Sequence, residues 1–233
     1  MHESSGIENS RCLGLVGGLG IGATIYYYER LAKGCEQHGL TLDIVITNAH
    51  TPRVFQYLEA RDRAGLAEYL NGYIRRMHGA GAEIAVIPAV TPHFSINELV
   101  TMSPVPILSI FDVLRAEISR RAIRRVAIFG TRFVIESDFF GALAHIEIVR
   151  PRSDEIDVIH STYVELAAEG KGSPEKRDRL KAVATRLVQR DRVDAIVLAG
   201  TDLALLFDES TAGFPCVDCA RAHVEEILRR VVA

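Results

Sequence analysis

The feature that most constrains the fold of this chain is an alternation of short apolar runs with amphipathic stretches, and this alternation occurs twice. In the first half, residues 13–16, 43–47, 84–87 and 105–110 have the composition of buried strands. Between them, residues 24–35 and 62–79 carry apolar side chains at helical spacing. Such alternation predicts parallel strands joined by crossover helices that cover both faces of a sheet.

The second half of the chain repeats this plan. Residues 126–129 end in Gly-Thr much as residues 13–16 end in Gly-Gly, and residues 195–198 mirror residues 84–87. Ser173 and Pro174 are the expected N-cap and first residue of a helix that runs to about residue 189. A strand at 214–217 leads into an amphipathic helix at 218–231. We predict two similar α/β domains, residues 11–112 and 113–217, with the helix 218–231 packing back on the first.

Composition limits the possible partners and location. The 233 residues are 48% hydrophobic and 24% charged, which is typical of a globular protein with a substantial core. The formal net charge of −3 gives no basic footprint for nucleic acid, so we expect no nucleic-acid partner. No run reaches the roughly 18 apolar residues of a membrane span. Residues 1–11 do not resemble a signal peptide, so we expect a frayed tail and a cytoplasmic location.

The four cysteines include a C-x-x-C motif at Cys216 and Cys219. This spacing occurs in redox sites and in half of a zinc site, and a thiol at a helix N-terminus can have a low pKa. The chain has no second C-x-x-C and no paired histidine cluster to complete a metal site. We therefore favour a structural role for these two cysteines and expect no bound metal.

The ends of the predicted strands indicate where a ligand binds. In open parallel sheets, ligands bind beyond the carboxyl ends of the strands. The loops that follow the strands therefore predict one composite cleft between the domains, suited to a small anionic ligand such as a carboxylate. The candidate ligand-binding residues in these loops are Gly17, Gly18, Gly20, Asn48, Arg53, Thr91, Thr131, Arg132 and Thr201.

The glycine-rich segment 17–24 has more than one interpretation. Gly18, Gly20 and Ala23 match G-x-G-x-x-A, but a dinucleotide site also requires an acidic residue at the end of the second strand, where this chain has Asn48. A glycine-rich turn at a helix N-terminus also presents N–H groups to a carboxylate or a phosphate. We favour the anion site, and a tight turn needed only for packing is the alternative.

His93 and Asp202 are the candidates for proton transfer. His93 follows the strand at 84–87, and histidine ordinarily titrates near neutral pH, but a structural role is equally compatible with this position. Asp202 could act as an acid or base, or it could cap a short helix predicted at 203–208. Arg132 could clamp a carboxylate with two hydrogen bonds, or it could pair with nearby acidic side chains, Glu136 or Asp138.

Taken together, these motifs resemble those of the aspartate/glutamate racemase superfamily. The similarity extends from about residue 13 to the last helix, and the motifs follow in the same order: residues 15–24, Thr91 with His93, residues 130–137, residues 198–203, and Asp218 with His223. The resemblance implies two Rossmann-like halves related by a pseudo-twofold axis, frequent formation of homodimers, and no cofactor or metal.

The resemblance also implies a difference in chemistry. Racemases of this superfamily use two cysteines, one per half, on opposite faces of the substrate α-carbon. The first cysteine lies in Cys-Asn-Thr-x-His, which here reads Ala-Val-Thr-Pro-His, with Ala89 at the cysteine position. The second cysteine lies in Gly-Cys-Thr-Glu-Leu, which here reads Ala-Gly-Thr-Asp-Leu, with Gly200 at the cysteine position. Neither alanine nor glycine can exchange a proton. We therefore expect two-thiol racemisation to be absent.

Two main functions are compatible with these residues. The first is an enzyme of the isomerase or lyase type that acts on a small carboxylic or amino acid, with His93 or Asp202 as acid or base. The second is a non-catalytic protein that binds such an acid. A nucleotide-dependent enzyme is a third and weaker alternative.

Overall fold

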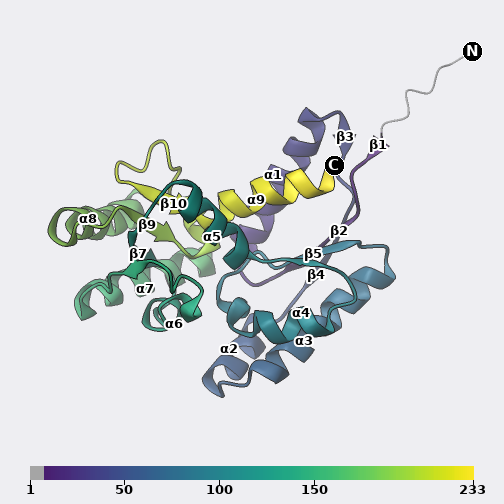
Figure 1. Ribbon diagram of the computed structural model, residues 1–233, viewed down its shortest axis with the longest axis horizontal. Helices are drawn as coiled ribbons and strands as arrows, with labels where there is room; N and C mark the ends of the chain where they lie inside the picture. Colours follow the sequence, from purple (N-terminus) through teal and green to yellow (C-terminus); the bar gives the residue numbers. More distant parts are fainter. Residues whose placement is uncertain (1–7) are drawn as a thin grey trace, which may run out of the picture.

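The chain forms two four-stranded parallel sheets with helices packed around them (Figure 1). The structure is a computed structural model that describes residues 8–233. Most of the tail expected at residues 1–11 lies outside the described residues. The part that is described is not frayed, because β1 (Glu8–Asn9) pairs in parallel with β3 (Leu40–Thr41). Among the described residues, no helix is long and apolar enough to cross a bilayer.

The first sheet has the strand order β4-β2-β5-β6. Its strands are β2 (Leu13–Gly17), β4 (Ile44–Asn48), β5 (Ile84–Val86) and β6 (Ile107–Leu108). The helical segments of this half are α1 (Ile21–Gln37), α2 (Thr51–Glu59), α3 (Arg63–Gly79), the 3-10 turn η1 (Thr91–Ser95) and α4 (Ile96–Met102). The Asp62 side chain caps α3 by accepting a hydrogen bond from the backbone N–H of Gly65.

The second sheet has the order β8-β7-β9-β10. Its strands are β7 (Arg125–Phe129), β8 (Glu147–Ile148), β9 (Ala195–Leu198) and β10 (Cys216–Asp218). Its helical segments are α6 (Arg132–Glu136), η2 (Phe139–Gly141), α7 (Ser153–Glu169), α8 (Pro174–Asp191) and η3 (Thr201–Leu205). In each sheet the second strand along the chain pairs with the first, the first with the third, and the third with the fourth. The two halves therefore share one topology, and the predicted α/β fold with two parallel sheets is confirmed.

The helices that follow the last strand of each sheet are exchanged between the halves. Helix α5 (Ile110–Arg120) follows β6, yet its Leu114 and Ile118 are buried in the core of the second sheet. Helix α9 (Cys219–Val231) follows β10, yet its Val224 and Ile227 are buried against strand β2 of the first sheet. Figure 1 shows α9 returning alongside α1, with α5 crossing near its beginning. Each half thus needs a helix from the end of the other to complete its core.

Candidate pocket between the two sheets

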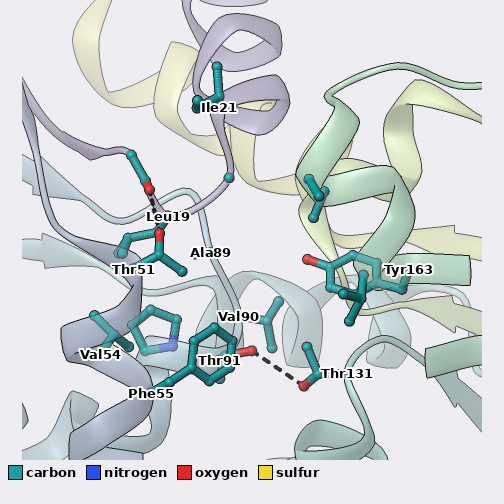
Figure 2. Close-up of a pocket in the computed structure, with 16 residues that line it drawn as sticks. Leu19, Ile21, Thr51, Val54, Phe55, Ala89, Val90, Thr91, Thr131 and Tyr163 are labelled. Carbon is teal, nitrogen blue, oxygen red and sulfur yellow. Dashed lines mark hydrogen bonds between the residues drawn. The ribbon is translucent and has the colours of Figure 1, made fainter. Parts of the chain in front are cut away.

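A pocket of about 370 Å³ lies where loops of the two halves meet (Figure 2). Its walls are the loop before α1, the first turns of α2, the loop after β5, and α7. The loops after β2, β5 and β7 all contribute, so the pocket is at the carboxyl ends of parallel strands, where ligands bind in open α/β sheets. Its volume is within the range of small-molecule sites.

The pocket brings together only part of the residue set that the sequence suggested. Its lining includes Gly18, Gly20, Ala89, Thr91 and Thr131. The other candidates are near it but do not line it: Gly17, Asn48, Arg53, His93, Arg132, Gly200, Thr201 and Asp202. Gly17 is buried at the end of β2, and Asn48 is exposed at the end of β4.

Threonine side chains join the two halves at the pocket. The hydroxyl oxygens of Thr91 and Thr131 lie 3.5 Å apart, one from each half (Figure 2). Thr201 is buried, and its hydroxyl donates to the carbonyl oxygen of Pro88 at 2.9 Å. The first pair therefore offers hydroxyls to a ligand, whereas Thr201 links the loop after β9 to the loop after β5.

Tyr163 occupies the side of the pocket next to Gly200. A Cβ atom added to Gly200 would lie 2.2 Å from Cε2 of the Tyr163 ring, which is far inside van der Waals contact. The Tyr163 hydroxyl points into the pocket, toward the side that Ala89 and Val90 line (Figure 2). Burial raises the pKa of Tyr163 well above its usual value, so the phenol stays protonated. The tyrosine ring thus takes the space that a side chain at residue 200 would need.

Asp202 caps a helix of the other half. Its Oδ1 accepts a hydrogen bond from the backbone N–H of Ala23 in the first turn of α1 at 3.0 Å, and its Oδ2 accepts one from the Tyr163 hydroxyl at 3.3 Å. Gly20 has a φ of 130°, and a Cβ there would lie 2.7 Å from Asp202 Oδ2, so only glycine fits against this carboxylate. Asp202 is fully buried, and burial raises its pKa.

These contacts change two expectations from the sequence. Asp202 does not cap the helix that follows it, because the short helix begins at Thr201, includes Asp202, and ends at Leu205 rather than 208. The N-terminus of α1, which we expected to bind a ligand anion, already has a carboxylate of the protein on the N–H of Ala23.

His93 links the loop after β5 to the first residue of α5 through backbone contacts. Its Nδ1 donates to the carbonyl oxygen of Ala89 at 2.8 Å, and its Nε2 accepts from the N–H of Ile110 at 3.2 Å. Burial lowers the pKa of His93 to about 4, so the ring is neutral near pH 7. Because both ring nitrogens are engaged and the ring does not line the pocket, this geometry favours the structural alternative over direct proton transfer.

The two arginines proposed for anion binding have partners elsewhere. Arg132 forms ion pairs with Glu136 and Asp157, which favours the pairing alternative, although Asp138 is not its partner. Arg53 lies over the rings of Tyr57 and Tyr69, with its guanidinium carbon 5.9 and 5.4 Å from the ring centroids. Neither guanidinium lines the pocket.

The cysteines lie away from the pocket. Cys12, Cys35, Cys216 and Cys219 are all buried free thiols, and none of them lines it. Burial raises the pKa of Cys216 to about 12 and the pKa of Cys219 well above its usual value. The alternative of a low-pKa thiol at the start of α9 is therefore wrong, because desolvation outweighs the helix N-terminus. Within residues 8–233, no three or more His, Cys, Asp or Glu side chains are grouped to hold a metal.

The pocket lining also includes residues of α7 and α2 that no sequence motif indicated. Helix α7 supplies Tyr163 and Val164, and α2 supplies Val54 and Phe55. The signal for α7 was present as apolar residues at helical spacing, Ile156, Ile159 and Leu166, with Tyr163 on the same face. No motif marks Tyr163 itself, because its importance depends on contact with Gly200 from a distant loop.

Comparison with known proteins agrees with this architecture. A crystal structure of a candidate Asp/Glu racemase from Yersinia pestis superposes with a TM-score of 0.81 at 23% identity, covering 96% of this chain and 100% of that one. An aspartate racemase homologue from Pyrococcus horikoshii OT3 gives a TM-score of 0.80 at 21% identity, with 96% and 100% coverage. The aspartate racemase of Picrophilus torridus gives 0.73 at 20% identity, with 94% and 93% coverage.

At these identities the solved structures establish the fold alone. The family is established by a sequence model, that of the Asp/Glu/Hydantoin racemase family, which matches residues 16–227 and thus includes both sheets and most of α9. This chain belongs to the Asp/Glu/Hydantoin racemase family.

Proposed function

We propose that this protein binds a small carboxylic or amino acid in the pocket between its two sheets and does not racemise it through a pair of thiols. The observation that carries the proposal is the contact between Gly200 and Tyr163. Since a Cβ at residue 200 would lie 2.2 Å from the Tyr163 ring, there is no space for a cysteine side chain on that side of the pocket. Ala89 lines the opposite side, so neither position provides a thiol.

The remaining pocket groups support binding of a carboxylate. Thr91 and Thr131 present two hydroxyls 3.5 Å apart, whereas the Tyr163 hydroxyl donates its proton to Asp202 Oδ2. Hydroxyl groups donate hydrogen bonds to carboxylate oxygens, and such charge-assisted bonds are stronger than neutral ones. The loop from Gly18 to Ile21 adds backbone groups at the start of α1.

A second function is favoured by the hydrogen bond between Tyr163 and Asp202. The phenolic oxygen of Tyr163 could accept a proton from the α-carbon of a bound acid while its own proton passes to Oδ2 of Asp202. This is acid–base chemistry through Asp202 without a thiol, and it is compatible with an isomerase or a lyase. The raised pKa of Asp202 makes this carboxylate a stronger base than one in water.

The test is a deuterium-exchange screen. The protein is incubated in D₂O with small carboxylic and amino acids, binding is measured by calorimetry, and deuterium at the α-carbon is measured by mass spectrometry. Binding without exchange supports the first proposal. The absence of binding by every acid would contradict it, whereas exchange or conversion of one enantiomer into the other would support the second function.

Tyr163→Phe distinguishes the second function from the first, because it keeps the ring and removes only the hydroxyl. If Tyr163 and Asp202 move the proton, exchange is lost in this variant while acid binding persists. Exchange at the wild-type rate in Tyr163→Phe would exclude the route through Asp202.

A further inference from the structure

The side chains that line the pocket carry no formal charge, as far as residues 8–233 define it. Most of its wall is apolar, and its apolar side chains include Leu19, Val54, Phe55, Val90, Pro92 and Val164. The polar side chains of the lining are the hydroxyls of Thr51, Thr91, Thr131 and Tyr163. The hydroxyl of Thr51 donates to the carbonyl oxygen of Gly18 at 2.6 Å, and that of Tyr163 donates to Asp202 Oδ2 at 3.3 Å. The hydroxyls of Thr91 and Thr131 are therefore the donors left for a ligand.

The rim of the pocket is apolar as well. Ile21, Phe55 and Val164 line the pocket and are also 68%, 44% and 47% exposed, so they surround its opening to solvent. A charged group of a bound ligand would meet these side chains before it reached water. The apolar environment therefore extends from the interior of the pocket to its mouth.

The charged side chains nearest in the chain are engaged elsewhere. Arg132 is paired with Glu136 and Asp157, and Arg53 is stacked on tyrosine rings outside the pocket. The carboxylate of Asp202 is fully buried, with its oxygens on Ala23 and Tyr163. A second ligand carboxylate would thus lack a cation, and a ligand ammonium would lack an accessible anion.

These features provide different environments for the carboxylate of a bound ligand and for the rest of that ligand. One carboxylate can accept hydrogen bonds from Thr91 and Thr131, whose hydroxyl oxygens lie 3.5 Å apart (Figure 2). The rest of the ligand lies against apolar walls, where a charge without a partner is costly and a hydrocarbon group is favourable.

We infer that the pocket takes a monocarboxylic acid with a branched aliphatic or aromatic side chain, in preference to a dicarboxylate or an α-amino acid. This inference rests on the proposed function, because it names the class of acid that the same pocket binds. It differs from what the family name alone suggests, since aspartate and glutamate carry three charged groups each.

Four ligands of nearly equal shape test the inference. They are 4-methylpentanoate, succinate, leucine and aspartate: succinate replaces the isopropyl group of 4-methylpentanoate with a carboxylate, and leucine and aspartate add an α-ammonium to each. Calorimetric titration of the intact protein measures all four dissociation constants. We expect 4-methylpentanoate to bind at least about 50-fold more tightly than succinate, which corresponds to burial of roughly three apolar carbons. Leucine should bind more weakly than 4-methylpentanoate.

The outcomes separate this inference from the proposed function. If succinate or aspartate binds as tightly as 4-methylpentanoate, the inference is overturned while an acid-binding function remains. If none of the four binds, or if neutral 4-methylpentanamide binds as well as the acid, the carboxylate-binding function itself fails.

A variant with an added cation provides the reverse test. Val164→Arg places a guanidinium at the rim, and since Val164 is half-exposed on α7, the fold should tolerate it. Succinate affinity should rise about tenfold and 4-methylpentanoate affinity should fall. Val100→Arg on α4 is the matched control, because Val100 is 52% exposed and does not line this pocket. Equal changes in both variants would contradict the assignment of the ligand to this pocket.

Discussion

The contact between Gly200 and Tyr163 makes a quantitative prediction about stability. Gly200 has φ −125° and ψ 117°, an extended conformation that any residue can adopt, so alanine there causes no backbone strain. Its Cβ would nevertheless lie 2.2, 2.7 and 2.8 Å from Cε2, Cζ and Cδ2 of Tyr163. Gly200→Ala must therefore displace the tyrosine ring and weaken its hydrogen bond to Asp202.

The expected loss follows from these two effects. Overpacking a buried site costs about 1–3 kcal/mol, and leaving a buried polar group without its partner costs about 1–3 kcal/mol. We expect Gly200→Ala to lower the free energy of unfolding by roughly 3 kcal/mol, in the lower half of the summed range. For a protein of this size, that corresponds to a fall in Tm of about 6–12 °C. Because the chain has no tryptophan, unfolding is best followed by far-UV circular dichroism.

Two further variants control this measurement. Gly72 lies within α3, and a Cβ there would contact nothing within 4 Å, so Gly72→Ala should raise stability by about 0.5–1 kcal/mol. Tyr163→Ala removes the obstructing ring and itself lowers the free energy of unfolding. Adding Gly200→Ala to Tyr163→Ala should therefore lower the free energy of unfolding little further. A Tm of Gly200→Ala equal to that of the wild type, or a full additive loss in the double variant, would refute the steric argument.

Other predictions concern pH and ligand affinity. Burial lowers the pKa of His93 to about 4 and that of His223 to about 3. Below pH 6.5 the unfolded chain therefore binds more protons than the folded chain does. The free energy of unfolding should fall by about 1.4 kcal/mol per pH unit for each histidine as the pH decreases toward 4. Burial raises the pKa of Asp218 to about 7, so protonation of Asp218 in the folded chain opposes this trend between pH 3.8 and 7. Asp218→Asn should therefore make Tm fall more steeply between pH 6.5 and 4. An unchanged slope of Tm against pH would contradict these assignments. Thr91→Val and Thr131→Val should each weaken binding of 4-methylpentanoate about tenfold in calorimetry, whereas unchanged affinity would show that these hydroxyls do not contact the ligand. Thr91→Val should change Tm little, but Thr131→Val should lower it, because the Thr131 hydroxyl also caps α6 by accepting from the N–H of Val134.

The sheets could be predicted because their signals are local. Buried parallel strands have apolar runs that end in small or polar residues, and the spacing of Leu66, Leu70 and Tyr73 is sufficient to predict α3. Strand ends were therefore found to within a few residues. The length of β6 was overestimated, since residues 107–108 pair with β5 and the rest of the predicted 105–110 run leads into or out of the strand.

The candidate site was less predictable because its properties depend on contacts between distant segments. His93, Asp202 and Arg132 have residue types that suit catalysis and binding, but each has at least one partner within the protein that lies outside its motif. Tyr163 lies 37 positions before Gly200, and no local pattern connects them. The side-chain types were visible in the sequence, whereas their orientation and burial depend on tertiary structure.

The exchange of α5 and α9 has a consequence for how this chain folds during synthesis. Strand β2 leaves the ribosome early, but its apolar side chains Leu13 and Leu15 are covered in part by α9, which is made more than 200 residues later. Until then, the first sheet exposes an incompletely buried surface on which a chaperone could act. Expression of either half by itself should therefore yield aggregation-prone protein, and two separately produced halves should become soluble only when they are made together.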